Sequence, residues 1–169
     1  EAIVREDPDR KIVVVSAPGK RGPADAKITD LLYKCHDCVR AGTLFEAVFQ
    51  TIADRYREIV RDLGLGLDIE TELGHVRDNM ARHSTPDFAA SRGEYLNARI
   101  VASLLDSEFV DAAEIIRFDG VGRFDIEKTV AAVRAGALGE LDKVDALEEA
   151  ARVIRGLHGG WPVLGAATW

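Results

Sequence analysis

Apolar residues follow one another without interruption near the start of the chain, in Lys11-Ile-Val-Val-Val-Ser-Ala-Pro-Gly-Lys20. A strand buried on both faces carries β-branched residues in succession, whereas a half-exposed strand alternates apolar and polar residues. We therefore expect a buried parallel strand over residues 12–15 inside a layered α/β fold. Ligands of such folds bind beyond the carboxyl ends of strands, which makes the following loop the first candidate site: Ser16, Ala17, Gly19 and Lys20.

Further along, apolar residues recur every three or four positions, the spacing of one helix face. The clearest such stretch follows Thr43 and comprises Leu44, Val48, Ile52, Tyr56, Ile59 and Leu63. The same spacing predicts helices from Thr29 or Asp30 to about Gly42, over about 68–82, from Pro86 to about Leu105, and over about 141–157. Helix caps are expected at Thr29 or Asp30, Thr43, Ser84 or Thr85, and Asp125.

Two segments have a weaker pattern. Residues 108–116 predict a short strand followed by a turn or a second strand. The stretch from Trp161 to Trp169 shows no clear period. We expect this apolar tail to be exposed and to favour self-association, because unburied apolar patches often mark interfaces.

Composition and charge limit the classes of protein to which the chain can belong. The chain is 47% hydrophobic and 30% charged, which is typical of one globular domain with one core. Its formal charge of −7 argues against a general nucleic-acid or anionic-membrane surface. No apolar run approaches the roughly 20 residues that cross a bilayer, and the first residues lack a signal-peptide core. We expect a cytoplasmic protein.

The two cysteines, Cys35 and Cys38, form a Cys-x-x-Cys pair. A zinc site needs about four ligands, and the remaining histidines show no paired spacing. Leu31, Leu32 and Val39 recur with the cysteines at helical intervals. We therefore expect both thiols to pack as small apolar groups on a helix face, and we predict no metal site.

Four segments taken in order resemble the aspartate kinases of the amino acid kinase family: Val15-Ser-Ala-Pro-Gly-Lys-Arg21, Lys27-Ile-Thr-Asp-Leu-Leu32, Ser91-Arg-Gly-Glu-Tyr-Leu-Asn-Ala98 and Phe109-Val-Asp-Ala-Ala-Glu-Ile-Ile116. The resemblance covers about residues 1–130 and fades in a divergent tail over 138–169. It implies a single partial amino acid kinase-like domain over 1–169. The implied fold is an α/β sandwich with a parallel-rich sheet and a large helical portion.

The resemblance also implies a reaction, in which the γ-phosphoryl group of ATP passes to the side-chain carboxylate of L-aspartate on the way to lysine, threonine and methionine. ATP and Mg²⁺ are the implied cosubstrate and cofactor. Thr29, Glu94 and, less securely, Arg92 are the implied aspartate-binding residues. Ser16, Ala17, Gly19 and Lys20 are the implied nucleotide and phosphate-binding residues, and no catalytic residue is assigned.

Two features of the family pattern are missing from the sequence, the Lys-Phe-Gly-Gly-Ser-Ser strand and the later Arg-Gly-Gly-Ser-Asp loop. We therefore expect the 169 residues alone to be inactive as a kinase. Two alternatives stay open: another amino acid kinase, distinguished by substrate competition, and a noncatalytic helical binding or assembly module. Each candidate residue also has a plainer interpretation, as a turn residue at Ser16 and Gly19, a helix cap at Thr29, and a solvent-facing charge at Lys20 or Glu94.

Overall fold

The computed structural model describes residues 2–7, 12–83, 85–132 and 165–168. These residues form ten elements in chain order: α1 (Ala2–Arg5), β1 (Ile12–Val15), α2 (Ile28–Arg40), α3 (Glu46–Asp62), α4 (Ile69–His83), α5 (Pro86–Leu105), β2 (Glu108–Asp111), α6 (Ala112–Ile115), α7 (Ile126–Ala132) and β3 (Gly165–Thr168). The expected large helical portion is confirmed, and the described sheet is small.

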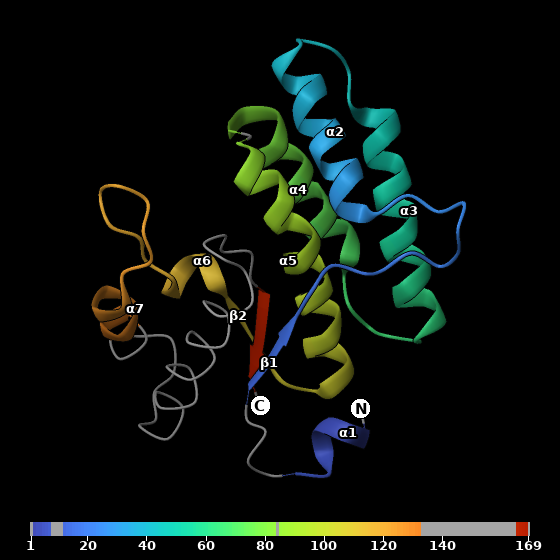
Figure 1. The fold of residues 1–169 in the computed structure, drawn as a ribbon. Coiled ribbons are helices and arrows are strands. Elements are labelled where there is room, and N and C mark those ends of the chain that lie inside the picture. Colours follow the sequence, from blue (N-terminus) through green and yellow to red (C-terminus); the bar gives the residue numbers. More distant parts are fainter. Residues whose placement is uncertain (1, 8–11, 84, 133–164, 169) are drawn as a thin grey trace.

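Helices α2 to α5 stand side by side and enclose the main core (Figure 1). Each helix contributes a stripe of apolar side chains at the predicted spacing. The fully buried members include Leu32 of α2, Ile52 and Tyr56 of α3, Met80 of α4 and Leu96 of α5. Burying one such side chain stabilises the fold by roughly 1.5–3 kcal/mol, so the bundle holds most of the hydrophobic stabilisation.

Two predicted helix starts are confirmed. The Thr85 hydroxyl accepts a hydrogen bond of 3.1 Å from the amide of Phe88, and Pro86 occupies the first helical position of α5. The Asp125 carboxylate accepts from the amide of Lys128 at 3.0 Å. Both side chains satisfy amides that a helix leaves without an intrahelical partner.

The start of α2 differs from the prediction. The N-cap position is Lys27, which makes no side-chain cap bond, and the helix begins at Ile28. Thr29 and Asp30 therefore lie inside the first turn rather than before it. There the charge of Asp30 favours the helix dipole without capping an amide.

The start of α3 differs as well. Phe45, not Thr43, is the N-cap residue, and the Thr43 hydroxyl donates instead to the carbonyl of Cys38 at 3.2 Å. Leu44 precedes the helix and is 87% exposed, so it does not belong to the buried stripe. At the other end Leu63 is also exposed, because it follows the last helical residue as the C-cap.

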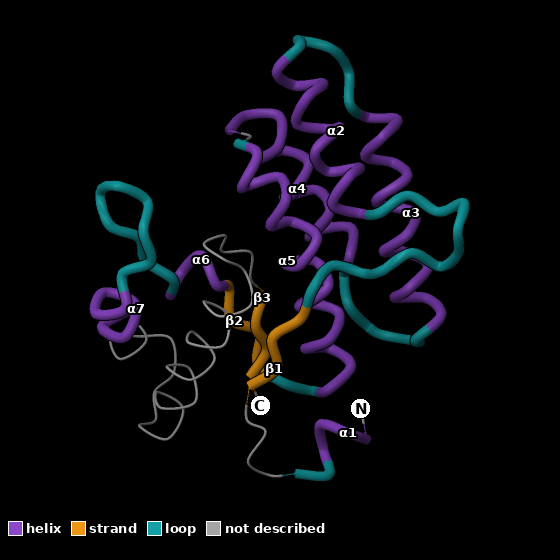
Figure 2. Tube along the Cα trace, in the orientation of Figure 1, coloured by secondary structure: helices purple, strands orange, loops and turns teal. Residues whose placement is uncertain are grey.

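The sheet has three strands in the order β1-β3-β2 (Figure 2). Strand β3 pairs antiparallel with both neighbours, so that Val15 and Asp111 both face Gly165 in register. Strands β1 and β2 consequently run in the same direction, but they are separated by β3. In the described sheet both pairings are antiparallel, although the sequence suggested a parallel-rich sheet.

Strand β1 is also less buried than its apolar run suggests. Val14 is 41% exposed, because β1 lies at an edge of the described sheet and α5 packs against one side of it. The segment predicted as an exposed apolar tail supplies, at Gly165–Thr168, the middle strand of this sheet. The helix predicted over 141–157 lies outside the described residues.

The cysteine prediction is confirmed as far as packing goes. Cys35 is fully buried in the core, and Cys38 packs against it from a half-buried position. Burial raises the pKa of the Cys35 thiol to about 12. Within the described residues, no helix is both long enough and apolar enough to cross a membrane.

Candidate functional site

The loop that joins β1 to α2 begins against the middle of α5. Ser16, the first residue after β1, is exposed, and its carbonyl accepts a hydrogen bond of 2.6 Å from the Asn97 side-chain amide. This bond joins residues that are far apart in the sequence. It fixes the carboxyl end of β1 over α5, where the sequence placed the candidate site.

The next residue of the loop packs on a glycine of α5. A Cβ atom added at Gly93 would lie 2.9 Å from the Cβ of Ala17 and 3.3 Å from side-chain atoms of Ile28 and Leu32. Real Cβ atoms do not approach other carbons so closely, so the missing side chain lets loop and helix meet. Gly93, which is unfavourable inside a helix, is thus explained by the close approach of Ala17 and α2.

Glu94 follows directly on α5 and is 7% exposed. The Tyr56 hydroxyl of α3 donates to the Gly93 carbonyl at 2.7 Å, and burial together with the charge of Glu94 raises the pKa of Tyr56. Residues three apart on a helix are neighbours, so Glu94 lies beside Asn97, which holds Ser16. Ser16, Ala17 and Glu94 therefore come to one side of α5.

Thr29 lies where the loop ends and the helical bundle begins again, in the first turn of α2. It is the second residue of α2 and is half-buried, and its neighbour Ile28 is one of the residues that approach Gly93. The first turn of a helix presents amides that have no intrahelical acceptor. The start of α2, the end of β1 and the middle of α5 thus surround the same part of the molecule.

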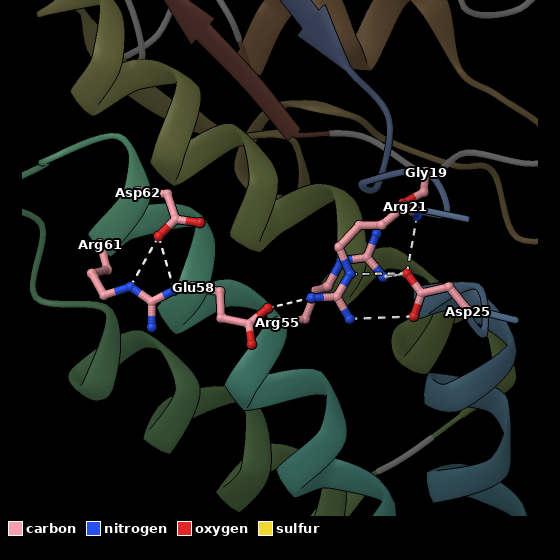
Figure 3. A network of polar contacts seen from close by, with 7 residues as sticks. All are labelled: Gly19, Arg21, Asp25, Arg55, Glu58, Arg61 and Asp62. Carbon is pink, nitrogen blue, oxygen red and sulfur yellow. Dashed lines mark hydrogen bonds and ion pairs between the residues drawn. The ribbon is translucent and has the colours of Figure 1, made fainter.

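Farther along the loop, an arginine of α3 holds the backbone. Arg55 donates to the carbonyl of Gly19 and forms an ion pair with the carboxylate of Asp25 (Figure 3). Lys20, the residue between these two points that the sequence selected, is exposed. Gly19 is therefore fixed through its carbonyl, and the Lys20 side chain extends toward solvent.

Arg92 lies on a different face of α5 from Glu94. Its guanidinium stacks over the rings of Phe88 and Tyr95, with 4.6 and 4.8 Å to their centroids, and donates to the Ser91 hydroxyl at 2.8 Å. Burial lowers the pKa of Arg92, and the charge of Asp111 opposes that shift. The structure does not bring Arg92 to the loop that follows β1.

Sequence reasoning missed three residues that shape this region, Arg55, Asp25 and Asn97. Arg55 carried a usable signal, since it falls three positions after Ile52 and four before Ile59, on the apolar side of α3. A charge at a core-facing position needs a partner, so a buried ion pair was predictable in kind. Its partner was not, because Asp25 lies in a loop without any periodic pattern.

Magnesium was the cofactor implied by the resemblance. Among the described residues, no group of three or more His, Cys, Asp or Glu side chains could hold a metal ion. These residues do not provide a complete set of oxygen ligands for Mg²⁺.

Comparison with known proteins gives two relatives of the same kind. Aspartokinase 3 of Bacillus subtilis (strain 168) is 36% identical over 110 residues, which make up 60% of this chain and 24% of that protein. The crystal structure of the allosteric aspartate kinase of Clostridium acetobutylicum superimposes with a TM-score of 0.75 at 47% identity. It covers 79% of this chain and 31% of that chain. No family model matches the sequence.

Proposed function

We propose that this aspartate kinase-like chain provides the aspartate-binding side of an enzyme that phosphorylates the side-chain carboxylate of L-aspartate. The chain spans about a quarter of the length of the curated relative and 31% of the structural one. Its similarity to both supports the reaction class. One observation carries the proposal: Ser16 and Ala17 contact α5 at Asn97 and Gly93, the part of the helix that also carries the buried Glu94.

In the proposed site Glu94 binds the α-ammonium group of aspartate. A carboxylate on a buried part of α5 offers the ammonium group a charge-assisted hydrogen bond. The Thr29 hydroxyl, at the start of α2, donates a hydrogen bond to an aspartate carboxylate. These two residues approach the substrate from different helices, which fixes its orientation as well as its position.

The loop after β1 serves the phosphate in this proposal. Ser16 and Ala17 have short side chains and Gly19 has none, which lets phosphate oxygens approach the backbone closely, and Lys20 supplies a positive charge on a flexible side chain. Arg92 remains part of the proposal as a second cation. Because its guanidinium is already bonded to Ser91, a substrate carboxylate would have to share it.

The chemistry requires little from the side chains beyond positioning. The aspartate side-chain carboxylate is ionised at neutral pH and attacks the γ-phosphorus of ATP, and ADP leaves with the electrons of the broken bond. No general base is needed. Catalysis then depends on holding the carboxylate in line with the phosphorus and on neutralising charge around it.

We also propose that residues 1–169 form part of one domain and that they transfer phosphate poorly by themselves. The support is the limited share of the relatives' length that the chain matches. Incubation with ATP, Mg²⁺ and aspartate, followed by trapping of acyl phosphate with hydroxylamine, tests this directly. Turnover clearly above a blank would contradict it.

Aspartate binding is the sharper test. Calorimetric titration with L-aspartate should give saturable binding that L-glutamate does not match. Glu94→Gln should weaken it by about 10- to 100-fold, because it removes one charge-assisted hydrogen bond. Glu46→Gln, an exposed carboxylate in the first turn of α3, is the matched control and should leave the Kd unchanged.

Three results would count against the proposal. Equal affinity for L-glutamate would favour another amino acid kinase. Equal effects of Glu94→Gln and Glu46→Gln would remove Glu94 from the site. A folded chain that binds neither aspartate nor ATP, yet associates with itself, would favour a noncatalytic assembly module.

A further inference from the structure

A buried arginine outside the proposed substrate contacts holds the loop at two points. The Arg55 side chain is only 6% exposed, although it extends from α3 among the apolar residues Ile52 and Tyr56. One nitrogen of its guanidinium bonds to the Gly19 carbonyl and another pairs with the Asp25 carboxylate. The loop residues between Gly19 and Asp25 are therefore held close to α3.

The Asp25 carboxylate joins this contact to a second arginine. Besides Arg55, it accepts from the backbone amide of Arg21 at 3.0 Å and from the Arg21 side chain at 3.1 Å. The Arg21 guanidinium in turn pairs with Glu58 of α3 (Figure 3). The loop is thus held internally by Asp25 and Arg21, and it is fastened to α3 by Arg55 and Glu58.

We propose that Arg55 is a positioning residue, which sets the conformation of loop 16–25 in which Ser16, Ala17 and Gly19 receive the substrates. This inference rests on the proposed function. In this proposal Arg55 acts on the substrates only through the loop, which contains both of its partners, Gly19 and Asp25. It acts by fixing Gly19, three residues after Ser16 is fixed by Asn97 of α5.

The physical basis is the entropy of ordering. Residues 16–20 have no regular secondary structure, so their conformation is not maintained by a ladder of backbone hydrogen bonds. When a loop becomes ordered only on binding, the entropy lost in ordering it weakens the affinity for the ligand. A loop that is already ordered in the free protein avoids this loss. The two residues held in place, Ser16 and Gly19, are themselves among the residues proposed to bind phosphate.

The side-chain type matters as well. The planar guanidinium presents several donors in a fixed fork, which allows one residue to serve a carbonyl and a carboxylate at once. A lysine carries one compact ammonium group at the end of a flexible stem. Lysine at position 55 should therefore keep the charge near Asp25 while losing the simultaneous contact with Gly19.

The test compares two arginines of the same helix. Arg55→Met removes the anchor, and Arg57→Met removes half-exposed pairs with Asp54 and Glu70, which lie away from the loop. Arg55→Lys and Asp25→Asn are milder variants in case Arg55→Met does not fold. For each folded variant, the Kd for L-aspartate, the exchange rate of the Arg21 amide and the Tm are measured, with binding assayed well below the Tm.

We expect Arg55→Met to raise the Kd about tenfold and to speed exchange of the Arg21 amide by a similar factor, with an intermediate effect for Arg55→Lys. Arg57→Met should change neither quantity. A purely structural role would lower the Tm and leave the Kd of the folded protein unaltered, and that result would overturn the inference.

Failure of the proposed function gives a different outcome. The wild-type chain would then not bind aspartate at all, while exchange of the Arg21 amide would still reveal whether Arg55 holds the loop. Faster exchange in Arg55→Met but not in Arg57→Met would support loop positioning even then. Unchanged exchange in both variants would refute it.

Discussion

On one side of α5 the helix backbone itself meets its neighbours, whereas on another side long charged and aromatic side chains reach across to α4 and β2. The first side, the loop face, carries Gly93 and Asn97 and receives Ala17 and Ser16. The second side, the charged face, carries Arg92, Tyr95 and Arg99.

The charged face is organised around a buried carboxylate of α4. Glu72 accepts a hydrogen bond of 2.7 Å from the Tyr95 hydroxyl and pairs with Arg99. The rings of Tyr95 and Phe109 meet edge to face at 5.4 Å, and the Arg99 guanidinium lies 4.8 Å from the Phe109 ring centroid. Burial and the bond to Glu72 raise the pKa of Tyr95.

The difference between the faces teaches how one helix can serve two purposes. Side-chain charges on the charged face join α4, α5 and β2 and contribute to the stability of the fold. On the loop face, Gly93 has no side chain, so the loop can lie close to the backbone of α5. Changes at Tyr95 or Arg99 on the charged face should therefore alter stability, and changes on the loop face should alter binding as well.

The largest effect on stability is expected on the charged face. Arg99→Met leaves the Glu72 carboxylate, whose side chain is 8% exposed, without its cation. Loss of one partner of a buried pair is strongly destabilising, but Arg99 is partly exposed, so we expect about 2 kcal/mol by urea denaturation. Aspartate affinity should stay unchanged.

Arg77→Met is the control for this variant, because it breaks an exposed pair with Asp78 and should cost less than about 0.5 kcal/mol. If Arg99→Met weakened aspartate binding in the folded protein, the two faces would not be independent. Equal stabilities of the two variants would show that the Glu72 cluster contributes nothing.

Gly93→Ala tests the loop face directly. Its new methyl group would clash with Ala17, Ile28 and Leu32, and overpacking costs about 1–3 kcal/mol against a gain of roughly 1 kcal/mol in helix propensity. We expect a net loss of about 1 kcal/mol together with a clear rise in the Kd for aspartate, measured by calorimetry.

The matched control is Gly74→Ala, at an interior position of α4 where an added Cβ would meet nothing within 4 Å. This change should stabilise the protein by up to about 1 kcal/mol through helix propensity alone. Opposite signs for the two glycines would support the close approach at Gly93. A stabilising Gly93→Ala would contradict it.

Asn97→Ala removes the bond that holds the Ser16 carbonyl at the end of β1. Because Ser16 is exposed, water can replace the amide, and we expect a loss of only about 0.5–1 kcal/mol. Hydrogen exchange in residues 16–20 should accelerate. Asn79→Ala, at an exposed position on α4, should change neither stability nor exchange.

The smallest expected effect is a pH dependence of the stability that the Asp25 carboxylate contributes through its contacts with Arg21 and Arg55. Hydrogen bonds from Arg21, with the charge of Arg55, lower the pKa of Asp25 from 3.8 to about 2. A carboxyl group whose folded pKa is depressed stabilises the protein above its unfolded pKa and loses that contribution as pH falls through the folded value.

The stability difference between the wild type and Asp25→Asn should therefore be constant above about pH 5 and shrink as the pH falls from about 4 to 2. Urea titrations at several pH values measure it. A difference that remained constant down to about pH 2 would contradict the assigned cause.

The helices could be predicted because their signals are local. The apolar period of α3 and the Thr85-Pro86 start of α5 depend only on neighbouring residues. Strands β1 and β2 were also predicted, but β3, which joins them, was not. It consists of the small residues Gly165-Ala-Ala-Thr168, which show neither alternation nor a β-branched run. A contiguous run of valines in β1 was wrongly taken as evidence of burial on both faces.

For the candidate residues, only their positions in the fold can be compared with the sequence analysis. Ser16, Ala17 and Glu94 were chosen from motifs, and the structure places them on one side of α5. The contacts that arrange them, from Arg55 and Asn97, join segments far apart in the sequence. The core-facing position of Arg55 indicates that it needs a partner, but a single sequence does not identify that partner. Asn97 and Asp25 each resemble an ordinary surface residue in the sequence.

The position of β3 has a consequence for how the molecule is made. The strand at the centre of the sheet is the last of the three in chain order, so during translation β1 and β2 leave the ribosome before the strand that joins them. The helical bundle, whose contacts are local, can collapse early, while β1 and β2 still lack β3, their neighbour in the described sheet. Nascent chains should therefore depend on chaperones during that interval.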